Sequence, residues 1–241
     1  MGKSMYMLSI VIPTYNEEKR LQPTILAAIE YLNSRGLIGE IIISDDGSND
    51  ETIRIATKLL KNVPSIIITD FTHHGKGWAV RKGVLASRGD MVLFADADLS
   101  TPFIMLDSMV PWLLKGYSCV IGIRKKQLFK RYSQPLWRFL LGWGYLHIAN
   151  FALGISYEDI NCGFKIFEGK TARKLFSLQQ QWGWEFDAEI LFLASRFSFK
   201  VKEVPVIWHH KNGSKIDAWN DILRTIFFLG QIRLKIWFNR Y

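Results

Sequence analysis

The sequence lacks the features of several common protein classes. Its 241 residues include two cysteines, Cys119 and Cys162, which is too few for a disulfide framework or a zinc site and suits a reducing compartment. There is no internal repeat, low-complexity tract or proline-rich and serine-rich linker. A short apolar stretch at residues 5–13 has no cleavage motif after it, so we expect no signal peptide. With 49% hydrophobic residues, the composition excludes a disordered chain and suffices for one large α/β domain.

Acidic residues are absent between Asp107 and Glu158, and the charge is therefore uneven. Residues 1–120 carry a net charge of −1, whereas residues 121–241 carry +10 together with seven of the nine tryptophans. Basic residues interleaved with tryptophan are typical of proteins that bind an anionic membrane surface or nucleic acid. A solvated basic face is the alternative. Because no nucleic-acid motif is present, we expect no nucleic-acid partner.

Long hydrophobic runs are also absent. An uncharged apolar stretch, residues 139–155, has 17 positions and includes His147 and Asn150, so it lies at the lower end of the transmembrane range of about 17–25 residues. We expect a helix that lies in the bilayer interface or is buried in protein. The tail, residues 217–239, has a basic amphipathic pattern, which favours a helix lying on a membrane or packing on the domain. No transmembrane segment follows before Tyr241, and we expect a peripheral protein.

Short β-rich runs alternate with helical segments through most of the chain. Strands are predicted at 8–12, 40–44, 65–69, 91–95, 118–122, 163–167 and 201–208. Helices are predicted at 18–34, from Asn49 or Asp50 onward, and at 76–87, 103–114, 139–155 and 185–197. This alternation predicts an α/β fold with a mostly parallel sheet that is covered by helices on both faces.

Two carboxylates end the apolar run at residues 91–98. Asp96 and Asp98 follow a buried strand, and an open α/β sheet places its chemistry at this edge. Two close carboxylates are usually held ionised by a cation, and their hard oxygens suit Mg²⁺ or Mn²⁺ shared with a phosphate. The alternative is a strand-to-helix turn in which Asp98 or Ser100 caps the helix that begins near Pro102.

Polar turns follow two further predicted strands. The turn Pro13–Glu17 follows the first strand, and Asp45 and Asp46 follow the second. The glycine-rich dinucleotide fingerprint is missing after the first strand. Because the carboxyl ends of parallel strands meet at one edge, the three segments together favour a nucleotide diphosphate held by one metal ion.

These residues resemble family 2 glycosyltransferases with the GT-A fold, and within them the polyprenyl-phosphate and dolichyl-phosphate glycosyltransferases. The matching segments are IVIPTYNEE (10–18), SDDGSNDET (44–52), GKGWAVRKG (75–83), FADADLSTP (94–102), DINCGFKIF (159–167), WEFDAEILF (184–192) and NGSKI (212–216). Several of them are more similar to dolichyl-phosphate glucosyltransferases than to mannosyltransferases. The resemblance implies a single Rossmann-like catalytic domain over residues 1–241. Its nucleotide-sugar-binding half would be 1–122, and its acceptor-binding and membrane-facing half, with amphipathic helices, would be 123–241.

The resemblance also implies roles for individual residues. Asp98 is the expected direct ligand of Mg²⁺ or Mn²⁺, beside Asp96. The residues expected to bind the nucleotide sugar are Pro13, Tyr15, Glu17, Asp45, Asp46, Lys76 and Asp96.

The basic half is expected to bind the acceptor. A lipid monophosphate is already largely a dianion at neutral pH and needs charge compensation more than a general base. Arg124, Arg138 and Lys215 are the candidates for holding it, with surface solvation or lipid contact as the alternative for the two arginines. Asp159 would orient the acceptor or act as a base, unless it is a turn residue. Of Asp187 and the nearby Glu189, Asp187 is favoured to face the site.

The predicted reaction is inverting transfer of glucose from UDP-glucose to polyprenyl or dolichyl phosphate on the cytoplasmic face of a membrane. Mannose transfer from GDP-mannose, transfer to a soluble acceptor and nucleotide-sugar binding without turnover remain open. A homo-oligomer is possible from the sequence, which does not fix the oligomeric state.

Overall fold

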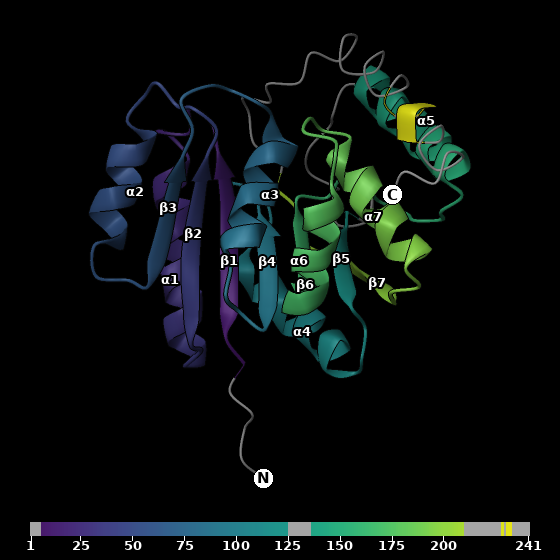
Figure 1. Cartoon of the computed structure of the whole chain (residues 1–241). Coiled ribbons are helices and arrows are strands. Elements are labelled where there is room, and N and C mark those ends of the chain that lie inside the picture. Colours follow the sequence, from purple (N-terminus) through teal and green to yellow (C-terminus); the bar gives the residue numbers. More distant parts are fainter. Residues whose placement is uncertain (1–5, 125–135, 210–227, 229, 233–241) are drawn as a thin grey trace.

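One seven-stranded sheet organises the chain in the computed structural model, which describes residues 6–124, 136–209, 228 and 230–232 (Figure 1). The strands are β1 (Leu8–Thr14), β2 (Gly39–Asp45), β3 (Ser65–Thr69), β4 (Met91–Ala95), β5 (Cys119–Ile123), β6 (Phe164–Glu168) and β7 (Val201–Pro205). The helices are α1 (Leu21–Arg35), α2 (Thr52–Leu60), α3 (Lys76–Ala86), the 3₁₀ turn η1 (Phe103–Met105), α4 (Leu106–Leu114), α5 (Leu136–Leu153), α6 (Gly169–Leu178) and α7 (Phe186–Arg196).

The sheet has the order β3-β2-β1-β4-β6-β5-β7 and is mostly parallel, as predicted. Strand β6 is the exception, because it runs antiparallel to both β4 and β5. The chain returns from α5 at the carboxyl edge of the parallel strands, so β6 starts at that edge and runs away from it (Figure 1). As a result Gly163, just before β6, lies beside Asp96, just after β4, whose N–H donates to the Gly163 carbonyl at 3.1 Å.

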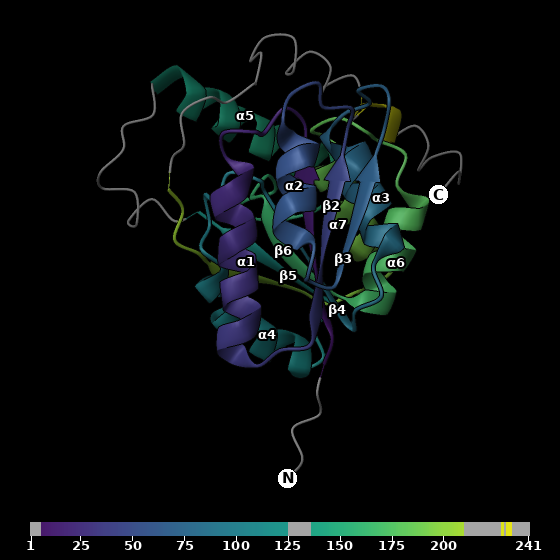
Figure 2. The same ribbon diagram turned by 90° about the vertical axis from the view of Figure 1, so that its left-hand side faces the viewer.

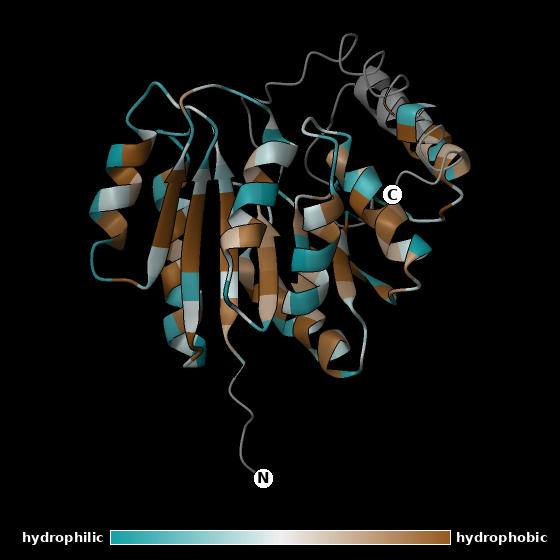
Figure 3. Cartoon of the chain, viewed as in Figure 1, coloured by the Kyte–Doolittle hydropathy of each residue, from teal (hydrophilic) through white to brown (hydrophobic). Residues whose placement is uncertain are grey.

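Helices cover both faces of the sheet, and alternate residues of each strand supply two cores. Ile10 and Ile12 of β1 belong to the core that includes residues of α1, α2 and α4, whereas Val11 belongs to the core that includes residues of α3, α6 and α7. Figure 2 shows α1 and α4 on one side of the sheet and α3 and α6 on the other. The central strands are hydrophobic along their length, as expected for parallel strands buried on both faces (Figure 3).

Three helices begin or divide at other residues than predicted. Helix α1 begins at Leu21 because residues 17–20 form a turn, in which the Glu17 carbonyl accepts the N–H groups of Arg20 and Leu21. Helix α2 begins at Thr52, and its N-cap residue is Glu51, which makes no side-chain capping bond, so neither Asn49 nor Asp50 is the N-cap. The Asp50 carboxylate accepts the Thr52 N–H at 3.0 Å from the position before the N-cap. The predicted helix 103–114 is divided into η1 and α4.

The helix predicted at 139–155 is confirmed by α5, which covers Leu136–Leu153. It lies beyond the carboxyl edge of the sheet in both views (Figures 1 and 2). Within the described ranges, no helix has the length and hydropathy required to cross a bilayer. The predicted tail helix lies almost wholly outside the described residues.

Candidate active site

The polar turns after β1, β2 and β4 meet at one edge of the sheet, as predicted. Thr14 at the end of β1 is in register with Asp45 of β2, and Val11 is in register with Phe94 of β4. Strands β1, β2 and β4 are parallel, so their carboxyl ends open onto a common edge.

Asp96 forms an ion pair with Lys76, the first residue of α3. The Lys76 Nζ lies 2.6 Å from Asp96 Oδ1, and the two side chains are 13% and 35% exposed. Burial lowers the pKa of Lys76, but the carboxylates of Asp96 and Asp187 outweigh it and hold that pKa above its usual range. A Cβ on Gly163 would overlap the Asp96 carboxylate. Glycine at 163 therefore makes the room that the Asp96 side chain occupies.

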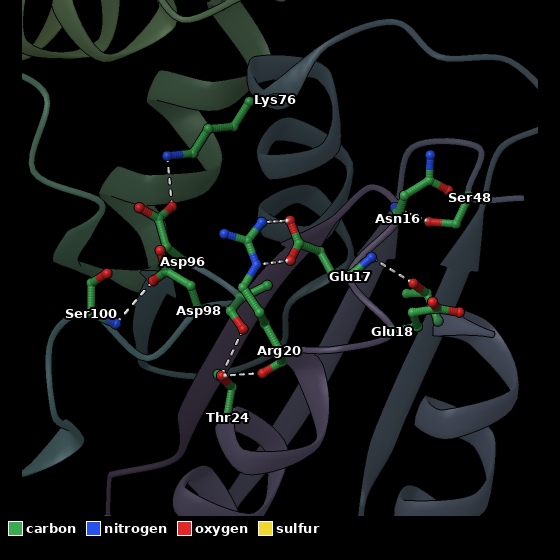
Figure 4. Close-up of polar contacts among 12 residues, drawn as sticks. Asn16, Glu17, Glu18, Arg20, Thr24, Ser48, Lys76, Asp96, Asp98 and Ser100 are labelled. Atoms are coloured by element: carbon green, nitrogen blue, oxygen red, sulfur yellow. Dashed lines mark hydrogen bonds and ion pairs between the residues drawn. The ribbon is translucent and has the colours of Figure 1, made fainter. Parts of the chain in front are cut away.

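Asp98 forms a tight turn with the residues that follow it. Its Oδ1 accepts the N–H of Ser100 at 2.9 Å, and Leu99 between them is left-handed with φ of 52° (Figure 4). A strand-to-helix turn is thus present and uses one of the two Asp98 carboxylate oxygens. Neither Asp98 nor Ser100 caps the next helix, because the N-cap residue of η1 is Pro102 and no side chain makes a capping bond there. Beside Asp96 lies a small pocket, lined in part by Ser100, Gly163 and Trp208.

The donors at this edge fit a divalent cation that is shared with a ligand. Among the residues that the structure describes, no three His, Cys, Asp or Glu side chains gather as a metal site. Asp96 and Asp98 would supply one or two carboxylate ligands, and the other positions would be taken by phosphate oxygens and water, as is usual for Mg²⁺. The carboxylate oxygens also suit Mn²⁺.

Asp45 and Asp46 are buried and hold the loops around them. Asp45 accepts the Thr14 hydroxyl and the Ser48 N–H, both at 2.8 Å. Asp46 accepts the N–H groups of His74 and Gly75 at 3.0 and 2.7 Å. Burial raises the pKa of Asp46 more than these donors lower it. Asp45 fixes the turn, and Asp46 fixes the loop that leads into α3.

An aromatic pair lies beside Asp46. The rings of Tyr15 and His73 stack with centroids 3.9 Å apart and an interplanar angle of 20°. The Nδ1 of His73 lies 2.7 Å from Asp46 Oδ2, and the His73 side chain is 51% exposed. Sequence reasoning missed His73, because nothing in the pattern around it indicates a stacking partner. Pro13 is buried within β1.

Glu17 contacts an arginine that the sequence reasoning also missed. Both of its carboxylate oxygens accept from Arg20, at 2.7 and 2.6 Å (Figure 4). The spacing of three residues between an acid and a base was the available signal.

Arg124 and Asp159, given separate roles from the sequence, form one bidentate pair. The Nε and Nη2 atoms of Arg124 donate to the Asp159 oxygens at 2.7 and 2.8 Å, and the Arg124 N–H donates at 3.1 Å. Burial raises the pKa of Asp159, but Arg124 outweighs this effect and holds it below the usual range. The Trp208 ring lies 5.6 Å from the guanidinium. The side chain of Arg138 and all of Lys215 lie outside the described residues.

Asp187 and Glu189 are both buried, so their exposure does not distinguish which of them faces the site. Asp187 pairs at 2.5 Å with Lys165, itself 1% exposed, and Asp187 also acts electrostatically on Lys76. Glu189 accepts the N–H groups of Gln180 and Gln181 and stabilises the turn before α7. Lys165 was not predicted, although a lysine within an apolar strand signals a buried partner.

The mostly parallel sheet with helices on both faces defines a GT-A-like α/β fold. The chain belongs to the family described as Glycosyl transferase family 2, which matches residues 9–176. It is 34% identical to the human dolichyl-phosphate beta-glucosyltransferase, over 92% of this chain and 74% of the relative. Identity to the enzyme of that name from Saccharomyces cerevisiae is 35%, over 94% and 74%. The resemblance inferred from the sequence is confirmed, and the protein is a glycosyltransferase.

Solved structures confirm the fold. A glucosyl-3-phosphoglycerate synthase from Mycobacterium tuberculosis in complex with uridine diphosphate is similar with a TM-score of 0.70, at 22% identity, over 96% of this chain and 81% of that one. Another structure of that synthase contains Mn²⁺ with uridine diphosphate, at a TM-score of 0.67, 22% identity, and 96% and 81% coverage.

Proposed function

We propose that this protein transfers glucose from UDP-glucose to dolichyl or polyprenyl phosphate, using Mg²⁺ or Mn²⁺, at the cytoplasmic face of a membrane. Two observations together support the proposal. Lys76, Asp96 and Asp98 lie at the carboxyl edge of the sheet. Relatives named dolichyl-phosphate beta-glucosyltransferase are identical to this chain at about a third of the aligned residues, over most of its length. The uridine diphosphate in the structural neighbour agrees with the nucleotide chosen.

On the donor side, Tyr15 stacks with the uracil ring and Asp46 contacts the nucleoside, with Asp45 fixing the turn beneath them. Pro13 and Glu17 shape the same pocket. Asp98 would hold the metal ion together with Asp96, and Lys76 would compensate the charge of the diphosphate. A bound metal ion stabilises the negative charge that develops on the leaving diphosphate.

On the acceptor side, a phosphate oxygen of the lipid attacks the anomeric carbon of glucose. The new C–O bond forms as the bond to the diphosphate oxygen breaks, and UDP leaves with that electron pair. An α-linked donor therefore gives a β-linked lipid phosphosugar. Arg124, Arg138 and Lys215 hold the acceptor phosphate, and Asp159 orients it through Arg124.

The membrane contact is assigned to the basic, tryptophan-rich half. On α5 the Phe151 and Ile148 side chains are 90% and 46% exposed. Apolar side chains of this kind bind the interfacial region of a bilayer when basic residues accompany them.

A donor panel tests the proposal. Radiolabelled UDP-glucose, GDP-mannose and UDP-N-acetylglucosamine are each incubated with dolichyl phosphate in detergent, with Mg²⁺, with Mn²⁺ and with EDTA. We expect metal-dependent lipid labelling from UDP-glucose. Labelling from GDP-mannose alone would overturn the donor assignment, and equal labelling in EDTA would overturn the metal assignment.

A further inference from the structure

We infer that Arg20 is a diphosphate-binding residue, held in place by Glu17 and directed at the site of Asp96 and Asp98. This inference rests on the proposed function, because it concerns the diphosphate of the same nucleotide sugar. It also changes the role of Glu17 from lining the nucleotide pocket to positioning an arginine.

The Arg20 guanidinium is fixed along one side and open along another. Its Nε and Nη2 atoms donate to the Glu17 carboxylate at 2.7 and 2.6 Å. The Arg20 and Glu17 side chains are 26% and 12% exposed. Figure 4 shows the remaining part of the guanidinium pointing toward Asp96 and Asp98. A planar guanidinium held in this way keeps donors for a second, phosphate-shaped acceptor.

The backbone under Arg20 is tied directly to the acidic turn. The buried Thr24 hydroxyl lies 3.2 Å from the Arg20 carbonyl and 2.7 Å from the carbonyl of Ala97 (Figure 4). Ala97 is the residue between Asp96 and Asp98 in the sequence. The Thr24 hydroxyl therefore links the start of α1 to the Asp96–Asp98 segment. A link of this kind helps to position an arginine for a ligand bound at the neighbouring segment.

The charges around Arg20 favour this role. Burial lowers the pKa of Arg20, but Glu17, Asp98 and Asp96 together hold it above its usual range. Lys76 pairs with Asp96 from α3, so cations from α1 and α3 flank the acidic pair. The two aspartates and the two negative charges of a bound diphosphate together exceed the charge of one divalent cation, and Lys76 and Arg20 offset part of the excess.

Helix capping does not explain the arginine. Arg20 is the N-cap residue of α1 and makes no side-chain capping bond. Serine, threonine, aspartate or asparagine would serve that position better. Its contacts run instead toward Glu17 and the acidic edge.

The test measures binding of UDP and of uridine, with Mg²⁺ present, to the wild type and to Arg20→Gln, Arg20→Lys and Glu17→Gln. We expect Arg20→Gln to weaken UDP about ten- to a hundredfold with uridine unchanged, because the lost bonds are to phosphate. Arg20→Lys should recover part of the loss. Glu17→Gln should weaken UDP less than Arg20→Gln does and should also spare uridine. The matched control is Arg35→Gln, at the other end of α1, where the arginine pairs with Asp107.

Unchanged UDP binding in a folded Arg20→Gln protein would overturn the assignment, and so would an equal loss of UDP and uridine. Thermal unfolding of each variant shows whether it is folded. If the wild type itself binds no UDP, the proposed function fails together with this inference. If the wild type binds UDP and the variant binds it equally well, the inference alone fails.

Discussion

The Lys76 ammonium lies 2.6 Å from Asp96 Oδ1, beside the place where a divalent cation would bind. Without a nucleotide, the ammonium and the cation compete for the same carboxylate. We therefore expect Lys76→Met to bind Mn²⁺ about tenfold more tightly in the absence of nucleotide, since a neighbouring positive charge is removed, while glucosyl transfer falls. Electron paramagnetic resonance titration of free Mn²⁺ measures the affinity. Lys82→Met is the control, because Lys82 lies on the same helix as Lys76 and pairs with Asp70, which follows β3. An equal change in both variants would contradict the competition.

Asp98 should be indispensable for transfer and not for folding. Asp98→Asn keeps an oxygen that can accept the Ser100 N–H, but it removes the charge that a metal needs. We expect transfer to fall at least about a hundredfold, with the thermal midpoint within a few degrees of the wild type. Retained activity would remove Asp98 from the metal site.

A methyl group at Gly163 should disturb the site more than the fold. In Gly163→Ala the new Cβ overlaps the Asp96 carboxylate, so the side chain must rotate away from Lys76. We expect activity to fall by at least tenfold, because the carboxylate moves by about 1 Å or more. Gly144→Ala is the matched control, since a Cβ there meets no atom within 4 Å. Comparable activities in the two variants would show that the position of Asp96 is not critical.

The Arg124–Asp159 pair should make stability depend on acid pH. The pKa of Asp159 lies below its usual value in the folded protein, so the ionised carboxylate stabilises the fold above the unfolded pKa of about 4. The contribution is lost as the pH falls through the folded pKa. We expect Asp159→Asn to cost about 2–4 kcal/mol of unfolding free energy at pH 7, with the difference shrinking below pH 4.

Denaturant titrations from pH 7 to pH 3 measure this difference. Asp107→Asn breaks the exposed pair with Arg35, whose side chains are 41% and 39% exposed, and should cost less than about 1 kcal/mol. A cost for Asp159→Asn that does not vary with pH would mean that its charge is not the source.

Helix α5 should contribute to membrane binding through Phe151. This side chain is 90% exposed, and we expect Phe151→Ser to weaken binding to vesicles of mixed neutral and anionic lipid by about tenfold, because burying an aromatic ring contributes roughly 1.5–3 kcal/mol. Sedimentation with vesicles measures binding. Ile38→Ser, at the opposite edge of the sheet and 48% exposed, should bind as the wild type does. Equal binding by all three proteins would exclude this part of α5 from the contact.

The parallel strands and the acidic edge could be predicted because their signals are local. An apolar run that ends in Asp96 and Asp98 specifies both a buried strand and a polar turn. The direction of β6 could not be predicted in this way, because it depends on where the chain returns after α5. The same limit applies to the pairing of Arg124 with Asp159, which are 35 residues apart.

The contact partners of several polar side chains could not be predicted from the sequence. Glu17 was assigned to the nucleotide pocket, and its contact with Arg20, three residues further along the chain, was not predicted although the spacing allowed it. His73 stacks on Tyr15 from a loop that is far away in the sequence. Lys165 and Asp187 show the same dependence, since the two side chains meet only when β6 and α7 pack together.

A competition between a lipid acceptor and a soluble acceptor tests whether this protein transfers glucose to dolichyl phosphate. Wild-type protein is given radiolabelled UDP-glucose and Mg²⁺ with equal concentrations of dolichyl phosphate in detergent and 3-phosphoglycerate in the same tube, and the label is partitioned between organic and aqueous phases. We expect the label on lipid phosphate in the organic phase, and no label in that phase when dolichyl phosphate is left out. Label that is transferred to the soluble phosphoester while dolichyl phosphate stays unmodified would contradict it.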